Sequence, residues 1–439
     1  MSERVGDQQA GTARSPASAG DVSRLPFGTG IETRSMSTGI ETRSMSEVLT
    51  AIRDRAEDAA ARTLRLRGSD SFSFGIEEEY FVVDAGTKAI VLTRPAQFLA
   101  DAKRMLGDQV AVEMLQSQIE VATLPHVDMA TARAELKYLR QSLARVAAQH
   151  GLAIVASGTY PTADWWQAQP SAGRRYETIM HDLGAVGKRD MLCGLHVHVE
   201  LPNGEDRVEV MSRMLPYLPL FIALSTSSPF WQSQPTGLMG YRLAAYDELP
   251  RTGIPELLRS REEFDAYVEA LTRGGVIDDA SYVWWAIRPS LHHPTLELRA
   301  PDSCTFVDDS IAIAALYRSL ARMLVRDPLR NADLTAVERA IIVENKWRAQ
   351  RYGIHGTLVD ERSGCAQRVP DVLDELLDDV LADAEALGCI PEVLRCRAIA
   401  NGGTSADAQL AVFDAEAKSA GRSAALAAVA DWLTAATLQ

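Results

Sequence analysis

Three consecutive carboxylates, Glu77 to Glu79, interrupt a hydrophobic run from Phe74 to Asp84 that otherwise favours a β-strand. Side chains of a strand alternate between its two faces, so Glu77 and Glu79 share one face and Glu78 belongs to the other. Cα atoms two residues apart in a strand are roughly 6.5 to 7 Å apart, which lets each carboxylate hold a different one of two neighbouring Mg²⁺ ions. A solvated edge strand with an acidic outer face would show the same residues.

A second predicted strand, Met191 to Leu201, carries two histidines and an acid on one face. Strand alternation places His196, His198 and Glu200 together, with aliphatic side chains on the opposite face. A lone histidine is usually structural. Two histidines at positions i and i+2, with an acid beyond them, favour a metal or substrate site.

Two further predicted strands each contribute a carboxylate. Glu120 lies in the middle of Ile119 to Leu124, and Glu113 precedes it in the chain. In the last of these strands Glu297 and Arg299 face the same way, and they could simply neutralise one another on the sheet surface. They also meet the needs of a metal-nucleotide site, in which the carboxylate binds a cation and the guanidinium binds phosphate oxygens.

Four separate strands thus bring carboxylates or imidazoles to one face. If these strands pair antiparallel, their side chains would form a cage for two or three Mg²⁺ ions. Such ions bridge the phosphates of ATP and screen the charge that develops during phosphoryl transfer.

The elements around these strands are mostly helical. Periodic leucines predict a helix over Asp128 to His150, a buried strand follows at Leu152 to Ser157, and Tyr282 to Arg288 is expected to pair with the strand of Glu297. From Phe306 onward the pattern is almost entirely helical. No linker rich in Gly, Pro or Ser divides this part of the chain, so residues 47–439 are predicted to form a single catalytic domain.

Composition excludes several classes of partner. With 46% hydrophobic and 24% charged residues, the 439-residue chain can bury a substantial core. The formal net charge of −14 argues against nucleic acid or an anionic membrane as a partner, because both require basic patches. No apolar run was expected to reach the roughly 18 to 20 residues that span a bilayer. Five scattered cysteines without CxxC pairing predict reduced thiols in the cytoplasm and no zinc site.

The N-terminal residues differ from the rest. Residues 1–46 are rich in Gly, Ser, Thr and Arg and contain a near-tandem repeat at 28–36 and 37–45. Such a segment cannot bury enough apolar surface to offset its ordering entropy, so a disordered extension is predicted.

Six segments together resemble one family: Gly-Ile-Glu-Glu-Glu-Tyr, Gln-Ser-Gln-Ile-Glu-Val-Ala-Thr, Cys-Gly-Leu-His-Val-His-Val, Ser-Ser-Pro-Phe-Trp, Leu-Glu-Leu-Arg and Glu-Asn-Lys-Trp-Arg-Ala-Gln-Arg-Tyr-Gly. They occur in this order over roughly residues 70 to 430 and resemble the glutamate-cysteine ligase type 2 family, also called YbdK-like carboxylate-amine ligases. More distantly, the chain is similar to glutamine synthetase. The resemblance implies an α+β fold in which a curved, mainly antiparallel sheet forms an open funnel packed with helices.

By this resemblance, ATP phosphorylates a carboxylate substrate to an acyl phosphate, and an amine then attacks it to form an amide. The resemblance implies two Mg²⁺ sites, one held by Glu77, His196 and Glu297, the other by Glu79, Glu120 and, as a further candidate, Glu113. His198 would hydrogen-bond the substrate carboxylate, and Arg299 would neutralise the transferring phosphoryl group.

Three other arginines are candidates for the site. Arg242 is expected to bind a substrate carboxylate or the acyl phosphate. Glutamine synthetase has Arg-x-Glu-x-Arg where this chain has Thr295 to Arg299, so Arg288 on the preceding strand is a candidate for the missing charge. Arg348 is predicted to bind the nucleotide, although a structural salt bridge is an equal alternative.

The family name suggests glutamate and cysteine as substrates, but the acid and the amine stay open. A metal-dependent amidohydrolase is one alternative, disfavoured because regular βα units are lacking; a non-catalytic nucleotide-sensing protein on a ligase fold is another. His292 and His293, in the turn before Glu297, have no counterpart known to us in the family. The exposed face of such a sheet could support a homodimer.

Overall fold

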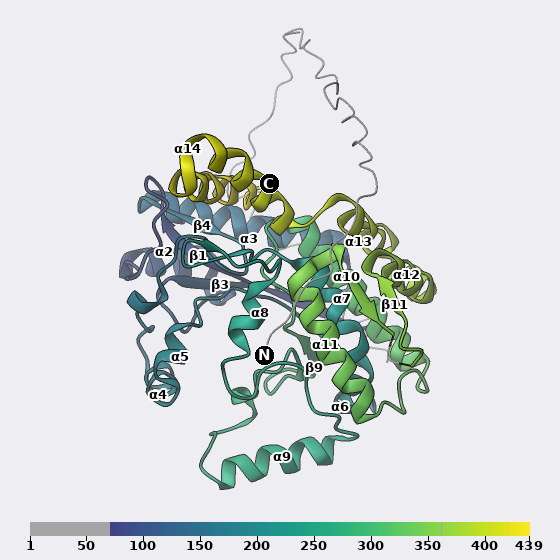
Figure 1. Ribbon diagram of the computed structural model, residues 1–439. Helices are drawn as coiled ribbons and strands as arrows, with labels where there is room; N and C mark the ends of the chain where they lie inside the picture. The colour runs from purple at the N-terminus through teal and green to yellow at the C-terminus, as the bar shows by residue number, and fades with distance from the viewer. Residues whose placement is uncertain (1–70, 361) are drawn as a thin grey trace, which may run out of the picture. The chain divides into compact units, whose positions relative to one another are not determined.

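The computed structural model describes residues 71–360 and 362–439 (Figure 1). These residues belong to one compact unit, Arg55–Gln439. The predicted extension at residues 1–46 lies outside the described residues, and the division into an extension and one catalytic domain stays a prediction.

The centre of this unit is a seven-stranded sheet in the order β2-β3-β1-β5-β9-β8, with β4 also pairing with β1. Each pairing in it is antiparallel. Its strands are β1 (Phe74–Asp84), β2 (Val110–Val112), β3 (Gln118–Ala122), β4 (Leu152–Val155), β5 (Leu195–Glu200), β8 (Ile287–Pro289) and β9 (Thr295–Leu298). The predicted α+β class with a mainly antiparallel sheet is confirmed.

The strand predicted over Tyr282 to Arg288 begins later than expected. The chain from Tyr282 to Ala286 does not pair as a strand; a short 3₁₀ turn ends at Tyr282, and pairing with β9 begins at Ile287. The apolar side chains that suggested a strand are instead buried in the core as irregular chain. Two small hairpins lie outside the main sheet: β6 (Phe230–Trp231) with β7 (Gln234–Pro235), and β10 (Thr357–Val359) with β11 (Ala366–Arg368).

Helices surround the sheet and make up most of the C-terminal half (Figure 1). They are α2 (Ala96–Leu106), α3 (Met129–Gln149), α4 (Arg174–Leu183), α5 (Ala185–Lys188), α6 (Arg207–Met214), α7 (Leu218–Ser225), α8 (Tyr241–Tyr246), α9 (Arg261–Arg273), α10 (Val307–Arg326), α11 (Ala336–Tyr352), α12 (Val369–Ala386), α13 (Ile390–Gly402) and α14 (Ser405–Ala436). The last helix is interrupted at Gly421, whose φ of 83° is non-helical.

One apolar stretch of the described chain is longer than the sequence analysis predicted. Arg207–Ser225, which comprises α6, α7 and the turn between them, is long and apolar enough to cross a membrane by length and composition, contrary to the sequence prediction. In the structure 83% of this stretch is buried inside the protein. It therefore packs as part of the hydrophobic core.

The strand register decides which side chains meet. Glu77 lies directly opposite His196 on β5, and Glu79 lies opposite Glu120 on β3. On the other side of β5, Glu297 of β9 lies opposite His198. Directly opposed residues of antiparallel strands project from the same face, so this register gathers the polar side chains on one side of the sheet.

The opposite face of β1 is packed against helices. Ile76, Tyr80 and Val82 are fully buried there, and Glu78 is buried among them. The Glu78 carboxylate accepts two hydrogen bonds from Arg140 of α3, Nε–H to Oε2 at 2.7 Å and Nη2–H to Oε1 at 2.6 Å. Because both of its oxygens are paired with Arg140, the Glu78 carboxylate stabilises the fold and is not part of the site.

Candidate active site

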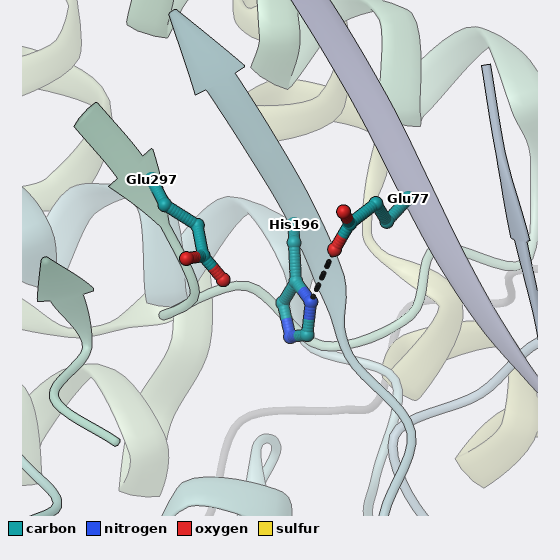
Figure 2. A group of neighbouring side chains, drawn as sticks. All are labelled: Glu77, His196 and Glu297. Carbon is teal, nitrogen blue, oxygen red and sulfur yellow. Dashed lines mark hydrogen bonds and ion pairs between the residues drawn. The ribbon is translucent and has the colours of Figure 1, made fainter. Parts of the chain in front are cut away.

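One group of potential cation ligands comes from three neighbouring strands: Glu77 of β1, His196 of β5 and Glu297 of β9. One ligand atom of each lies within 4.8 Å of the others, and Figure 2 shows the three side chains extending to the same side of the sheet. The Nδ1 atom of His196 lies 3.2 Å from Glu77 Oε2. Although burial alone would raise it, hydrogen bonds from His196 and His198 hold the pKa of Glu77 well below its ordinary value, so this carboxylate is ionised.

A second group lies beside the first and consists of three carboxylates, Glu79, Glu113 and Glu120, again with ligand atoms within 4.8 Å of one another. Burial, then the charge of Glu113, raises the pKa of Glu79 to about 8. Burial together with Glu77 and Glu113 raises the pKa of Glu120 well above its usual value. Three acids this close repel one another unless a proton or a cation is present, and carboxylate oxygens are the ligands that Mg²⁺ prefers.

His196 connects the two groups. Its Nε2 atom is 3.6 Å from Glu79 Oε1, while its Nδ1 atom faces Glu77. Burial and the charge of Arg299 lower the pKa of His196 to about 4, so the imidazole is neutral, the form that binds metals. Nε2 is buried and has no hydrogen-bond partner among the described residues, so the donor atoms of this face fit a bound cation.

Two arginines flank Glu297. Arg288 donates Nε–H to Glu297 Oε2 at 2.7 Å and Nη2–H to Oε1 at 3.2 Å, and Arg299 donates Nη1–H to Oε1 at 2.5 Å. Although burial would raise it, Arg299 and Arg288 hold the pKa of Glu297 well below its usual range. Since a carboxylate offers about four lone pairs, Glu297 can accept these bonds and still ligate a cation.

His198 lies beside the same carboxylates. Its Nε2 atom is 3.2 Å from Glu77 Oε1, and its Nδ1 atom is 2.9 Å from the Thr295 hydroxyl. The ring of His293 stands edge-on to the His198 ring, with centroids 5.8 Å apart. The turn whose role the sequence left open therefore lies next to the residue predicted to bind the substrate carboxylate.

Arg242 of α8 is buried against the end of β9. Its Nη1–H donates to the carbonyls of Arg299 at 3.2 Å and Pro301 at 3.0 Å. A Cβ at Gly194 would lie 2.2 Å from Arg242 Nη2 and 3.1 Å from His196 Nε2. A side chain at Gly194 would therefore displace Arg242 or His196, which occupy the space that it would need.

Arg348 of α11 contacts the strand that follows its own helix. Its Nε–H donates to the Thr357 carbonyl at 2.6 Å, another guanidinium nitrogen binds the Thr357 hydroxyl, and the group lies over the Tyr352 ring. These contacts fix the end of α11 to β10. They fit the structural alternative for Arg348, and nucleotide binding by this residue stays a prediction.

Sequence reasoning missed two polar groups on this side of the molecule. Tyr246, at the end of α8, places its hydroxyl 3.5 Å from Arg299 Nη2. Asp190 lies in the segment before β5, and the charges of Glu113, Arg242 and Arg299 contribute to its pKa. Both lie outside the strands, where no side-chain alternation marks a face. Only Asp190 lies close in sequence to the Cys-Gly-Leu-His segment, and no pattern marks Tyr246.

The fold, with its mainly antiparallel sheet, has counterparts among solved structures of known proteins. Among solved structures, a glutamate-cysteine ligase of Francisella tularensis in complex with AMP superposes with a TM-score of 0.60 at 15% identity, covering 84% of this chain and 89% of that one. A bifunctional glutathione synthetase of Pasteurella multocida gives 0.59 at 17% identity, covering 83% and 52%. At these identities the likeness shows the fold.

The sequence pattern described as Glutamate-cysteine ligase family 2 matches residues 73–427, so the chain belongs to this family. Two relatives named "Putative glutamate--cysteine ligase 2" come from Bradyrhizobium. The one from B. diazoefficiens is 51% identical, covering 88% of this chain and 89% of its own length. The one from strain ORS 278 is 55% identical, covering 84% and 88%. The predicted resemblance and the prediction of an ATP-dependent ligase that forms amides from small molecules are confirmed; the amidohydrolase alternative is not favoured.

Proposed function

We propose that the acidic face of the sheet is the active site, where a carboxylate substrate is activated by ATP and joined to an amine. The observation that carries this proposal is the adjacency of two ligand groups. His196 lies between Glu77 and Glu79, at 3.2 and 3.6 Å, so two cations held by the two groups would be neighbours. The names of the relatives suggest glutamate and cysteine as the acid and the amine.

Mg²⁺ bound at the two groups would supply positive charge that screens the phosphates of ATP. Glu77, His196 and Glu297 would hold one ion, and Glu79, Glu113 and Glu120 the other. This assignment accounts for the buried carboxylates that repel one another and for the unpartnered Nε2 of His196.

The chain's own cations would stabilise the reacting groups. Arg299 is largely buried, with 13% of its side chain exposed, and its paired Glu297 fixes its orientation, so it is preorganised for a phosphoryl oxygen; Arg288 of β8 binds the same Glu297 carboxylate. Arg242 would bind the carboxylate or the acyl phosphate through its Nε–H, which has no hydrogen-bond partner among the described residues. His198 would orient the substrate carboxylate.

The predicted compartment, partners and oligomeric state also belong to this proposal. The protein would act in the cytoplasm, where the five cysteines, all free in the structure, would stay reduced. Nucleic acid is not expected as a partner because of the net charge of −14. The homodimer stays a prediction.

The experiment is phosphate release from Mg-ATP by the purified protein with amino acids offered singly and in acid-amine pairs. We expect release to require a pair, with glutamate plus cysteine the first to test, and to fall at least about 100-fold in Glu297→Ala, since loss of outer-shell partners of a metal alone costs 10- to 100-fold. Glu205→Ala, an exposed acid before α6, is the matched control. Metal-dependent ATP binding without turnover by any pair would contradict the proposal and favour a nucleotide-sensing protein.

A further inference from the structure

Asp302 is a buried acid just beyond β9, the strand that carries Glu297. It forms an isolated antiparallel bridge with Gly194, the residue before β5. A Cβ at Gly158 would lie 2.6 Å from Asp302 Cγ, so the chain after β4 also packs directly against its side chain. Three segments of the fold therefore converge on this carboxylate, which the two ligand groups do not include.

The Asp302 carboxylate is bound by two consecutive serines. Its Oδ2 atom accepts the Ser227 N–H at 3.0 Å and the Ser228 hydroxyl at 2.6 Å. The Ser228 hydroxyl oxygen in turn accepts the main-chain N–H of Arg242 at 3.0 Å. A hydroxyl has a single hydrogen to donate, and because this one goes to Asp302, a lone pair of the same oxygen is left for Arg242. The carboxylate thus orients the group that holds the main chain of α8 at Arg242.

The side chain of Arg242 is bound to the segment that leads to Asp302. Its Nη1–H donates to the carbonyls of Arg299 at 3.2 Å and Pro301 at 3.0 Å. Carbonyl oxygens orient a guanidinium group without neutralising its charge, and Arg242 Nε has no hydrogen-bond partner among the described residues. Arg242 is therefore held at both its main chain and its side chain, with its charge left for a ligand.

The guanidinium group that is held in this way adjoins the ligand groups. A Cβ at Gly194 would lie 2.2 Å from Arg242 Nη2 and 3.1 Å from His196 Nε2, so both nitrogens border the same small space. His196 Nε2 is itself 3.6 Å from Glu79 Oε1. A shift of α8 would therefore move the Arg242 charge relative to the proposed cations and the reacting groups, where small misplacements have large kinetic effects.

We infer that Asp302 is a positioning residue that, through the Ser228 hydroxyl, fixes Arg242 where the acid substrate binds. This inference rests on the proposed ligase function, in which Arg242 binds the substrate carboxylate or the acyl phosphate. Burial raises the pKa of Asp302, although the charge of Arg242 and the serine donors partly offset this effect. A proton on the other oxygen, Oδ1, would leave Oδ2 free to accept both bonds, so the link to Arg242 does not depend on ionisation.

Ser228→Ala tests this link because it removes the hydroxyl between Asp302 and Arg242 and leaves the Ser227 N–H bond to Asp302 in place. The assay is phosphate release from Mg-ATP with the acid-amine pair that supports it, glutamate plus cysteine first. We expect kcat/KM for the acid to fall about 10-fold or more through a higher KM, while KM for ATP changes by less than about 2-fold.

The matched control is Ser212→Ala in α6. It also removes a buried hydroxyl, which donates to the Leu258 carbonyl and has no link to Arg242. Both KM values should stay within about 2-fold of the wild type. A fall in kcat for Ser228→Ala with both KM values unchanged, as a smaller folded fraction would give, counts against the inference.

Further variants separate positioning from folding. Asp302→Ala should lose as much as Ser228→Ala, whereas Asp302→Asn, which keeps an oxygen that can accept from both serines, should stay within about 3-fold of the wild type. In an Arg242→Ala background, adding Ser228→Ala should lower kcat/KM by less than about 2-fold, because the group that Ser228 positions is already gone.

The double variant gives the decisive outcome. If Ser228→Ala costs as much without the Arg242 side chain as with it, Ser228 does not act through Arg242 and the inference is overturned. Asp302→Asn as impaired as Asp302→Ala would show that the hydrogen bond through Ser228 is not the cause, and would overturn it as well. If the wild-type protein releases no phosphate with any pair, the proposed function itself fails, and the inference fails with it.

Discussion

Glu78 and Glu79 are adjacent acidic residues of β1, and their side chains lie in opposite environments. Glu78 points to the helical side and is fully buried, yet both of its oxygens are bound by Arg140, and Tyr80 and Ser310 donate their hydroxyls to it as well. Glu79 points to the other side, accepts one main-chain N–H from Gly194, and lies near His196 and two more carboxylates. A buried charge that is fully paired holds the fold together, whereas buried charges of one sign left facing each other mark a place for a cation.

The largest effect on stability is expected from removing Arg140, the partner of Glu78. Arg140→Met leaves the Glu78 charge buried without its partner, and it also removes donors from the carbonyls of Thr305, Cys304 and Thr437. The free energy of unfolding, measured in urea, should fall by about 3 to 5 kcal/mol. Arg104→Met, on the exposed part of α2, should change it by less than about 0.5 kcal/mol. A loss as small in Arg140→Met as in that control would show that the pair is not structural.

Substitution of Glu79, on the other face of β1, should have the opposite effects on stability and activity. Glu79→Gln removes a carboxyl group that repels Glu113 when it is ionised, and keeps an oxygen able to accept from the Gly194 N–H. We expect phosphate release to fall at least about 100-fold while the free energy of unfolding without metal stays the same or rises. Circular dichroism melts and the phosphate assay on one preparation would measure both. Destabilisation with retained activity would reverse the roles assigned to the two faces.

A smaller effect tests the packing between Arg242 and β5. In Gly194→Ala the new methyl group would overlap the Arg242 guanidinium, which is held by two carbonyls and must shift. We expect about a 10-fold or greater loss of kcat/KM, since small misplacements of a site residue have large kinetic effects. Gly402→Ala, where a Cβ meets no atom within 4 Å, is the control. Equal activity of the two variants would remove Arg242 from the site.

The smallest expected effect is a difference in pH dependence with and without metal. The folded-state pKa of Glu79 is raised from 4.5 to about 8, so the metal-free folded protein binds more protons than the unfolded chain between these values. Stability from this group is therefore complete below about pH 4.5 and is lost as the pH rises toward 8. Melting temperatures in EDTA should decline over this window, and Mg²⁺ should restore them most at the alkaline end. Parallel curves with and without Mg²⁺ would contradict the assignment.

The sequence predicted the acidic face because strand alternation is a local rule. Once β1, β5 and β9 pair antiparallel, Glu77, His196 and Glu297 must share a face, and the register brings them together. The partner of Glu78 was not predictable, since Arg140 lies on α3 and no local pattern links a helix position to a strand position 62 residues away. The contacts of Arg348 were not predictable for a similar reason: helical spacing places it on a face but does not say that the Thr357 carbonyl accepts its Nε–H.

The most direct test of the central claim is to count cations. Mn²⁺ accepts the same oxygen and imidazole ligands as Mg²⁺, and its bound fraction can be followed by electron paramagnetic resonance in the presence of a non-hydrolysable ATP analogue. We predict two Mn²⁺ ions on the wild-type protein and one each on Glu77→Gln and Glu79→Gln, because each variant disables one ligand group. Wild-type protein that binds no Mn²⁺, or variants that bind as many ions as the wild type, would show that the unpaired carboxylates of β1 are not a two-cation site.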